Sequence, residues 1–155
     1  MKRMLVAAIT GLAIAIPSLG TAAPDEARKQ LKQSLSPVTV YKSPTCGCCG
    51  EWVKHMQASG FRVESREVAD VTPIRHKYGV PDELSSCHTA LVGGYTIEGH
   101  VPAADIKRLL RERAKATGLA VSGMVVGSPG MEQGPPQPYT TIVFDGRGGK
   151  VFERH

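Results

Sequence analysis

Three of the four cysteines in this 155-residue chain stand within four residues, at Cys46, Cys48 and Cys49, and the fourth, Cys87, lies far along the sequence. A disulfide stabilises a small domain mainly by closing a loop in the unfolded chain, which favours cysteines spread along the sequence. Crowding three thiols into one turn loses most of that stabilisation. The spacing therefore favours a chemical role for the cysteines, with a disulfide-stapled binding module as the weakest alternative.

The residues on either side of this cysteine turn predict a strand followed by a helix. Residues 38–41 are β-branched or aromatic, and Ser43 and Pro44 end the run. After the turn, residues 49–56 carry apolar side chains three and four positions apart, and Gly60 ends the helical pattern. The cysteines are thus expected at a helix N-terminus, where free backbone N–H groups and the helix dipole lower the pKa of a thiol.

The rest of the pattern extends this start to a βαβαββα order, which indicates an α/β fold. Gly93 and Gly94 separate two short apolar strands and are typical of a two-residue hairpin. The further predicted elements are a strand over 61–68, a helix over 72–79, strands at 89–92 and 95–97, and a helix opened by Pro102 with the apolar face Ile106, Leu109 and Leu110.

Beyond residue 118 this regularity ends. Residues 122–138 are rich in Gly, Ser and Pro, contain Met124 and Met131, and predict a long loop. Residues 139–144 and 150–153 flank a glycine-rich turn and predict a terminal hairpin that extends a sheet edge. The expected organisation is a signal peptide at 1–23, a lead-in at 24–37, a core at 38–118, a methionine-containing loop at 119–138 and a hairpin extension at 139–155.

The first 23 residues predict a secretory signal peptide. A basic pair at 2–3 precedes an apolar run over 4–16 and small residues over 20–23. This run is too short to span a bilayer, so we expect cleavage near Ala22 or Ala23 and no membrane anchor afterwards. The mature protein is then expected in the periplasm.

The charge pattern argues against a nucleic-acid partner. Residues 1–23 hold two of the 19 Lys and Arg and none of the 14 Asp and Glu, which leaves 17 basic against 14 acidic residues, a formal charge of +3. The basic residues are scattered and aromatic residues make up 5% of the chain. Neither a basic stripe interleaved with aromatics nor a polybasic membrane patch is present in the sequence.

The strand, turn and helix around the cysteines resemble the start of the glutaredoxin fold, in which a Cys-x-x-Cys pair occupies the positions of Cys46 and Cys49. Residues 90–94 resemble the third strand and hairpin of that family. His88 stands where glutaredoxins carry a cis-proline beside the active cysteines. The resemblance implies that Cys87 and His88 lie beside the cysteine turn, so that all four sulfurs converge.

A convergent set of thiolates points to a soft metal. Thiolates select copper(I), zinc or iron–sulfur centres. Neighbouring cysteines fit one tetrahedral zinc poorly, whereas sulfurs that bridge two or three linear or trigonal copper(I) ions tolerate such crowding. We therefore predict a multi-thiolate, multinuclear copper(I) site with the ligands Cys46, Cys48, Cys49 and Cys87. Residues expected to support it are His88 and the thioethers of Met124 and Met131.

Several longer motifs narrow the resemblance further. They are Tyr41-Lys-Ser-Pro-Thr-Cys-Gly-Cys-Cys49, Ser86-Cys-His-Thr-Ala90, Glu98-Gly-His-Val-Pro102 and Gly127-Ser-Pro-Gly-Met-Glu132. Over residues 38–132 the chain closely resembles the DUF411 family, which includes copper-resistance proteins of the CopG type. The resemblance implies a thioredoxin-like fold, cysteine-bound copper, and a role in copper resistance among other periplasmic copper-handling proteins.

An oxidoreductase is the alternative function, so whether the protein is an enzyme stays open. It would use Cys46 as the nucleophile and Cys49 as the resolving thiol of thiol–disulfide exchange. Such chemistry does not require Cys48 or Cys87, and this favours the metal site.

The remaining histidines are expected outside the metal site. His55 is expected to pack against neighbours or lie exposed, because it stands about 10 Å along the helix from the cysteines. His100 is expected to shape the start of a helix, with metal binding as the weaker alternative. His76 and His155 are expected on the solvated surface.

Overall fold

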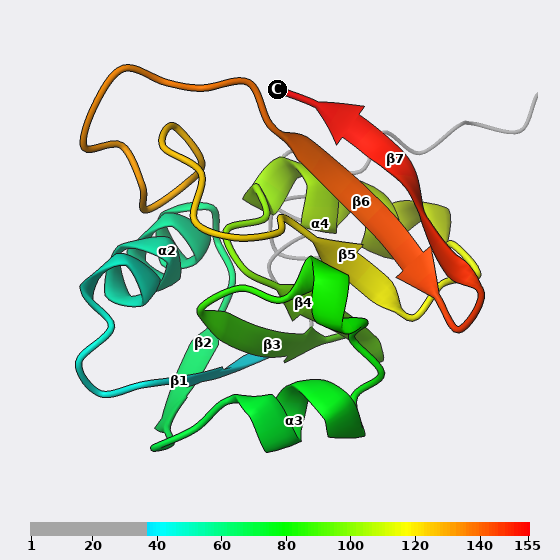
Figure 1. Cartoon of the computed structure of the whole chain (residues 1–155), viewed down its shortest axis with the longest axis horizontal. Helices are drawn as coiled ribbons and strands as arrows, with labels where there is room; N and C mark the ends of the chain where they lie inside the picture. Colours follow the sequence, from blue (N-terminus) through cyan, green and yellow to red (C-terminus); the bar gives the residue numbers. More distant parts are fainter. Residues whose placement is uncertain (1–36) are drawn as a thin grey trace, which may run out of the picture.

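The computed structural model describes residues 37–155, in which a seven-stranded mixed sheet carries helices on both faces (Figure 1). The strands are β1 (Val38–Lys42), β2 (Val63–Glu67), β3 (His88–Val92), β4 (Tyr95–Glu98), β5 (Gly118–Ala120), β6 (Thr140–Asp145) and β7 (Gly148–Arg154). The helices are α2 (Gly47–Ala58), α3 (Thr72–Lys77) and α4 (Ala103–Glu112), with a short 3₁₀ helix, η1 (Asp82–Leu84), before β3. The predicted signal peptide at 1–23 and the lead-in up to residue 36 lie outside the described residues.

The sheet has the strand order β2-β1-β3-β4-β5-β6-β7. β1 pairs parallel with β2, and β4 pairs parallel with β5, while the other neighbours are antiparallel. From β1 to α4 the elements follow the predicted βαβαββα order, with η1 added before β3. The α/β prediction is therefore confirmed.

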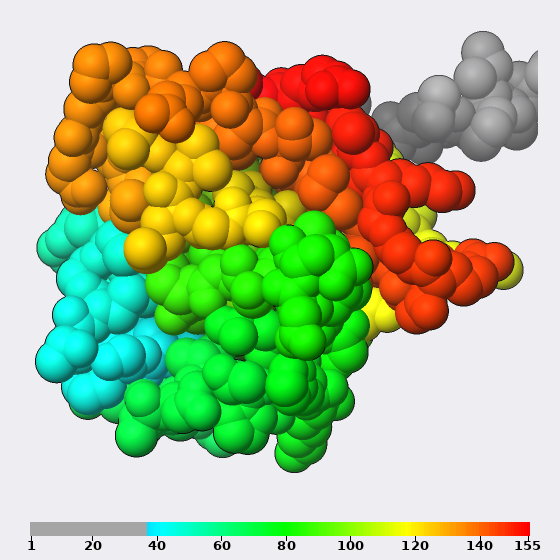
Figure 2. Space-filling model, viewed as in Figure 1, coloured from blue at the N-terminus to red at the C-terminus, as the bar shows by residue number. Residues whose placement is uncertain are grey.

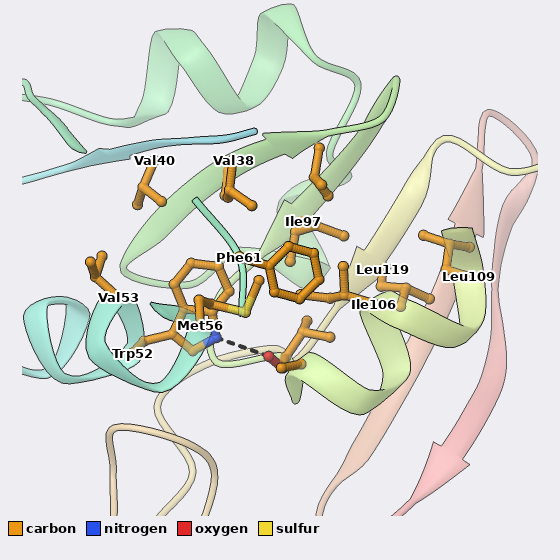
Figure 3. Packing of buried hydrophobic residues seen from close by; sticks show 14 of the residues in the cluster. Val38, Val40, Trp52, Val53, Met56, Phe61, Ile97, Ile106, Leu109 and Leu119 are labelled. Carbon is orange, nitrogen blue, oxygen red and sulfur yellow. Dashed lines mark hydrogen bonds between the residues drawn. The ribbon is translucent and has the colours of Figure 1, made fainter. Parts of the chain in front are cut away.

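The main core lies between the sheet and the pair α2 and α4, while α3 lies on the opposite face of the sheet (Figure 3). Val38 and Val40 point into this core because alternate residues of a strand face the same side. From α2, the buried stripe of Cys49, Trp52, Val53 and Met56 follows the three- and four-residue spacing of a helix face. The same stripe therefore anchors the cysteine turn to the core.

The C-terminal part extends the sheet. β6 and β7 form the predicted terminal hairpin and continue the sheet beyond β5. β5 itself was not predicted, because it is three residues long and begins with a glycine. A Cβ at Gly118 would collide with the backbone carbonyl of Thr96, so glycine is what allows β5 to pair closely with β4.

The segment between β5 and β6 forms the predicted loop, here named the covering loop (residues 121–139). It returns over α2, and its atoms, yellow and orange in Figure 2, lie directly against those of α2. Across residues 37–155, no helix combines the length and the hydropathy needed to cross a membrane.

Candidate metal centre

The cysteine turn lies at the N-terminus of α2. Cys46 is the N-cap residue, with an extended backbone, and its side chain makes no capping hydrogen bond. Cys48 and Cys49 occupy the first helical turn, where Cys49 faces the core and is fully buried. Cys46 and Cys48 remain half-buried and accessible from solvent.

Cys87 reaches this turn through the sheet. β1 and β3 are antiparallel, with Lys42 at the end of β1 opposite His88 at the start of β3. The chain leaving β1 towards the cysteine turn and the chain entering β3 through Cys87 therefore lie at the same edge of the sheet.

The four cysteine sulfurs lie within 4.8 Å of one another. Cys46 and Cys49 form a disulfide with a Cα–Cα distance of 5.4 Å, while Cys48 and Cys87 are free thiols. The sulfur of Cys48 lies 3.5 Å from that of Cys46, and the sulfur of Cys49 lies 3.7 Å from the backbone oxygen of Cys87. The described structure is thus the oxidised form of a four-sulfur cluster.

His100 joins this cluster, although the sequence favoured a role at the start of a helix. Its Nε2 lies 3.0 Å from the sulfur of Cys87, and its Nδ1 lies 2.8 Å from the carbonyl oxygen of Pro129. Because a carbonyl oxygen only accepts, Nδ1 carries the ring proton and Nε2 presents its lone pair to the thiol.

The sequence did contain a signal for His100. In the hairpin around Gly93 and Gly94, the residues of β3 and β4 pair one to one, and the last pair of the two strands is Thr89 with Glu98. Two further steps in the same register place Cys87 opposite His100.

His88 is fully buried beside both groups. Its ring centroid lies 4.5 Å from that of Trp52 and 5.1 Å from that of His100, and its Nδ1 lies 3.4 Å from the sulfur of Cys87. Its Nε2 is buried and has no hydrogen-bond partner. A buried polar atom of this kind is uncommon in native proteins and suggests a functional constraint.

Burial sets the protonation of these groups. It lowers the pKa of His88 to about 3, with His100 and Lys42 adding to the effect. It also lowers the pKa of His100, so both imidazoles are neutral at pH 7. Burial, with the neighbouring Cys48, raises the pKa of the Cys87 thiol to about 12. A metal that binds Cys87 must therefore displace its proton.

A buried ion pair holds the segment that carries Cys87. Glu98 is fully buried, and its Oε1 accepts hydrogen bonds from Arg75 Nε at 2.9 Å and the backbone N–H of Ser86 at 2.7 Å. Its Oε2 accepts from the hydroxyl of Thr89 at 2.6 Å, and Arg75 also donates to the carbonyl of Ser86 at 2.7 Å. These bonds fix the residues on both sides of the Cys87–His88 pair.

Arg75→Met is expected to destabilise the protein by about 3–5 kcal/mol, because it leaves the Glu98 carboxylate buried without its counter-ion. Urea denaturation followed by circular dichroism measures the change. The matched control is Arg66→Met, which removes an ion pair to Glu64 whose side chains are 54% and 66% exposed, and it should cost no more than about 1 kcal/mol. Equal costs for the two variants would refute a clamping role for Arg75.

The covering loop contacts the segments that carry the cluster residues. Ser86 donates a hydrogen bond from its hydroxyl to the carbonyl of Gly123, and the carbonyl of Pro129 accepts from His100. Gly130 lies so close to α2 that a Cβ there would stand 2.7 Å from the backbone oxygen of Cys48. Met131 is half-buried, whereas Met124 is 58% exposed.

The other histidines lie outside the cluster. His55 Nε2 accepts a hydrogen bond of 3.1 Å from the backbone N–H of Ala103, so it packs at the start of α4. His76 is exposed and pairs with Asp82. His155 lies at the surface but also contacts the buried carboxylate of Asp105 at 2.9 Å.

The fold and the site together define a class of mixed α/β proteins in which thiols at a helix N-terminus meet a cysteine and a histidine from a neighbouring hairpin. Within this class, the family described as "Protein of unknown function, DUF411" matches residues 84–131. Two solved structures, titled copper resistance protein CopG forms 2 and 1, are 43% and 42% identical to the chain, with TM-scores of 0.74 and 0.73. In each case the match covers 78% of this chain and 98% of the other.

The chain therefore belongs to the CopG-like DUF411 family of copper-resistance proteins. No curated protein matches it.

Proposed function

We propose that the protein is an exported copper(I)-binding protein of copper resistance, which holds copper through the thiolates of Cys46, Cys48, Cys49 and Cys87. The observation that carries the proposal is the gathering of all four sulfurs within 4.8 Å. The similarity to copper resistance protein CopG supports copper as the ion.

Distances favour a shared, multinuclear site. With metal–sulfur bonds of about 2.3 Å, two sulfurs bound linearly to one ion stand about 4.6 Å apart, and closer when the ion is trigonal. The sulfurs lie within 4.8 Å, which is close to this separation, so small side-chain rotations would let neighbouring sulfurs share an ion once the Cys46–Cys49 disulfide is reduced. The adjacent thiols of Cys48 and Cys49 suit bridging of several copper(I) ions better than one tetrahedral ion.

Other residues would support the site. His88 adds a buried imidazole beside Cys87, and Met124 and Met131 of the covering loop would supply thioethers suited to copper(I). The signal peptide expected at 1–23 would direct the chain to the periplasm, where other copper-handling proteins would deliver or receive the ions.

Reduced protein is expected to bind more than one copper(I) ion per chain, and protein with the Cys46–Cys49 disulfide markedly fewer, since oxidation removes two thiolate ligands. Anaerobic titration with a copper(I) donor, followed by desalting and metal analysis, measures both ratios. Fully alkylated protein serves as the control for nonspecific binding. The same low ratio in reduced, oxidised and alkylated protein would rule out the thiolate site.

A thiol–disulfide oxidoreductase is the second candidate, favoured by the Cys46–Cys49 disulfide itself. The half-buried Cys46 at the helix N-terminus suits the attacking thiol, and the buried Cys49 suits the resolving thiol. A disulfide-reduction assay with a protein substrate tests this activity directly.

A further inference from the structure

A cavity lies between the connection from α4 to β5 and the turn that joins β6 to β7 (Figure 1). Its volume is about 430 Å³, and residues 114–116, 143–145 and 147–150 line it. Sites for small molecules commonly have volumes of about 300–1,000 Å³. The cavity is therefore large enough for a small molecule, and none of its lining residues belongs to the cysteine cluster.

Apolar side chains form part of the cavity wall, and packing holds them in place. Phe144 is buried in a second hydrophobic cluster, while Ala114 and Val143 pack against the main core. The backbone N–H of Thr117 donates to the carbonyl of Phe144 at 2.8 Å, which ties the α4–β5 connection to β6. A ligand that enters a wall fixed in this way costs little conformational entropy.

Three basic side chains also line the cavity. Lys115, Arg147 and Lys150 are exposed to solvent. Asp145 is the acidic residue of the lining, and it accepts hydrogen bonds from the backbone N–H of Arg147 at 2.8 Å and from its guanidinium at 3.0 Å. These bonds lower the pKa of Asp145, so its carboxylate is ionised and its charge offsets that of Arg147. Neither lysine forms an ion pair within residues 37–155, which leaves two positive charges uncompensated.

The part of the chain that forms the cavity also carries the excess positive charge of the protein. Residues 37–106 contain 6 Lys and Arg against 8 Asp and Glu, a formal charge of −2, whereas residues 107–155 contain 8 against 4, a formal charge of +4. The basic residues of the second part lie on α4, in its connection to β5 and on the terminal hairpin. A local excess of one sign raises the concentration of oppositely charged ligands beside it.

We propose that this cavity binds a small organic anion, a molecule with an apolar body and one phosphate or carboxylate group. The apolar wall holds the body, and the ammonium groups of Lys115 and Lys150 attract the charged group. Arg147 adds a planar guanidinium, whose geometry matches the oxygens of a phosphate or carboxylate. No cysteine or histidine lines the cavity, so this second site does not rest on the proposed binding of copper(I).

Phenyl phosphate is the probe, titrated into the purified copper-free protein and followed by the amide resonances of residues 114–116 and 147–150. We expect saturable shifts at these residues, with a Kd of about 1 mM or lower. Lys115→Gln and Lys150→Gln should each weaken binding about two- to fivefold, since each removes one exposed charge. Asp145→Asn should strengthen binding by a similar factor, because the amide oxygen still accepts from the Arg147 backbone while the negative charge is lost.

Lys54→Gln is the matched control, because Lys54 is a 71% exposed lysine on α2 outside the cavity, and this variant should bind as the wild type does. Inorganic phosphate and benzyl alcohol each lack one half of the probe and should bind at least about tenfold more weakly. Thermal melting verifies that each variant is folded.

Absence of saturable shifts at the cavity residues of folded protein overturns the proposal. Equal affinity for phenyl phosphate and inorganic phosphate also overturns it, because surface charge alone would then explain the binding. Equal affinities of Lys54→Gln and the two cavity lysine variants have the same consequence. Neither result bears on copper(I) binding by the cysteines.

Discussion

Cys87→Ser and Cys48→Ser are each expected to lower the copper(I):protein ratio of the reduced protein by more than a single lost ligand would suggest. All four sulfurs lie within 4.8 Å, so each thiolate can bridge ions that its neighbours also hold. Losing one bridging sulfur then weakens several ions together. Metal analysis after anaerobic loading, with reductant present throughout, gives the ratio for each variant.

An oxidoreductase function predicts different effects for the cysteine substitutions. Cys46→Ser should abolish disulfide reduction and Cys49→Ser should accumulate mixed disulfides, because the nucleophile and the resolving thiol have separate roles. Cys48→Ser should leave disulfide reduction almost unchanged. The copper(I) cluster is wrong if Cys48→Ser and Cys87→Ser load as much copper as the wild type while Cys46→Ser alone stops thiol exchange. Ser59→Ala, at the C-terminal end of α2 and away from the cysteines, is the control for the preparation and copper loading of the variants.

Gly130→Ala is expected to destabilise the protein strongly and to loosen the covering loop from α2. The φ angle of Gly130 is +86°, and its Cβ would stand 2.7 Å from the backbone oxygen of Cys48 and 2.7 Å from the backbone nitrogen of Trp52. The left-handed conformation costs about 1–2 kcal/mol for a residue with a Cβ, and overpacking adds about 1–3 kcal/mol. Urea denaturation measures the sum.

Gly123→Ala separates these two contributions. Gly123 has a similar φ angle of +72°, but a Cβ there would meet nothing within 4 Å. It should therefore show the conformational cost alone, about 1–2 kcal/mol. Hydrogen exchange at the start of α2 should rise in Gly130→Ala and stay unchanged in Gly123→Ala. Similar losses of stability and similar exchange in both variants would mean that the loop does not rest on the cysteine turn.

Local patterns predicted the part of the site that depends on neighbours in sequence. The β-branched run before Ser43 and the helical spacing after it placed the cysteines at a helix N-terminus, as the structure does. The Gly93-Gly94 turn likewise predicted the β3–β4 hairpin. Strand alternation and helix periodicity are properties of a few consecutive residues, so a sequence shows them directly.

Contacts between distant residues were not predictable in this way. In the sequence Glu98 looks like an ordinary polar residue at a strand end, and its ion-pair partner Arg75 lies 23 residues earlier on another element. β5 was missed because Gly118 is required by the close approach of Thr96 and not by any local pattern. The position of His100 beside Cys87 was missed because it depends on extending the hairpin register beyond the strands and on a loop carbonyl 29 residues away.

Because the antiparallel pairing of β1 with β3 brings Cys87 to the cysteine turn, the complete cluster exists only in the folded protein. Cys46, Cys48 and Cys49 are neighbours in any conformation, but Cys87 follows Cys49 by 38 residues and meets it only when the sheet is assembled. Closing a loop of that length has an entropic cost that the strand pairing must overcome. An unfolded chain would offer an ion three sulfurs at most, so full loading belongs after folding, and bound metal would in turn resist unfolding.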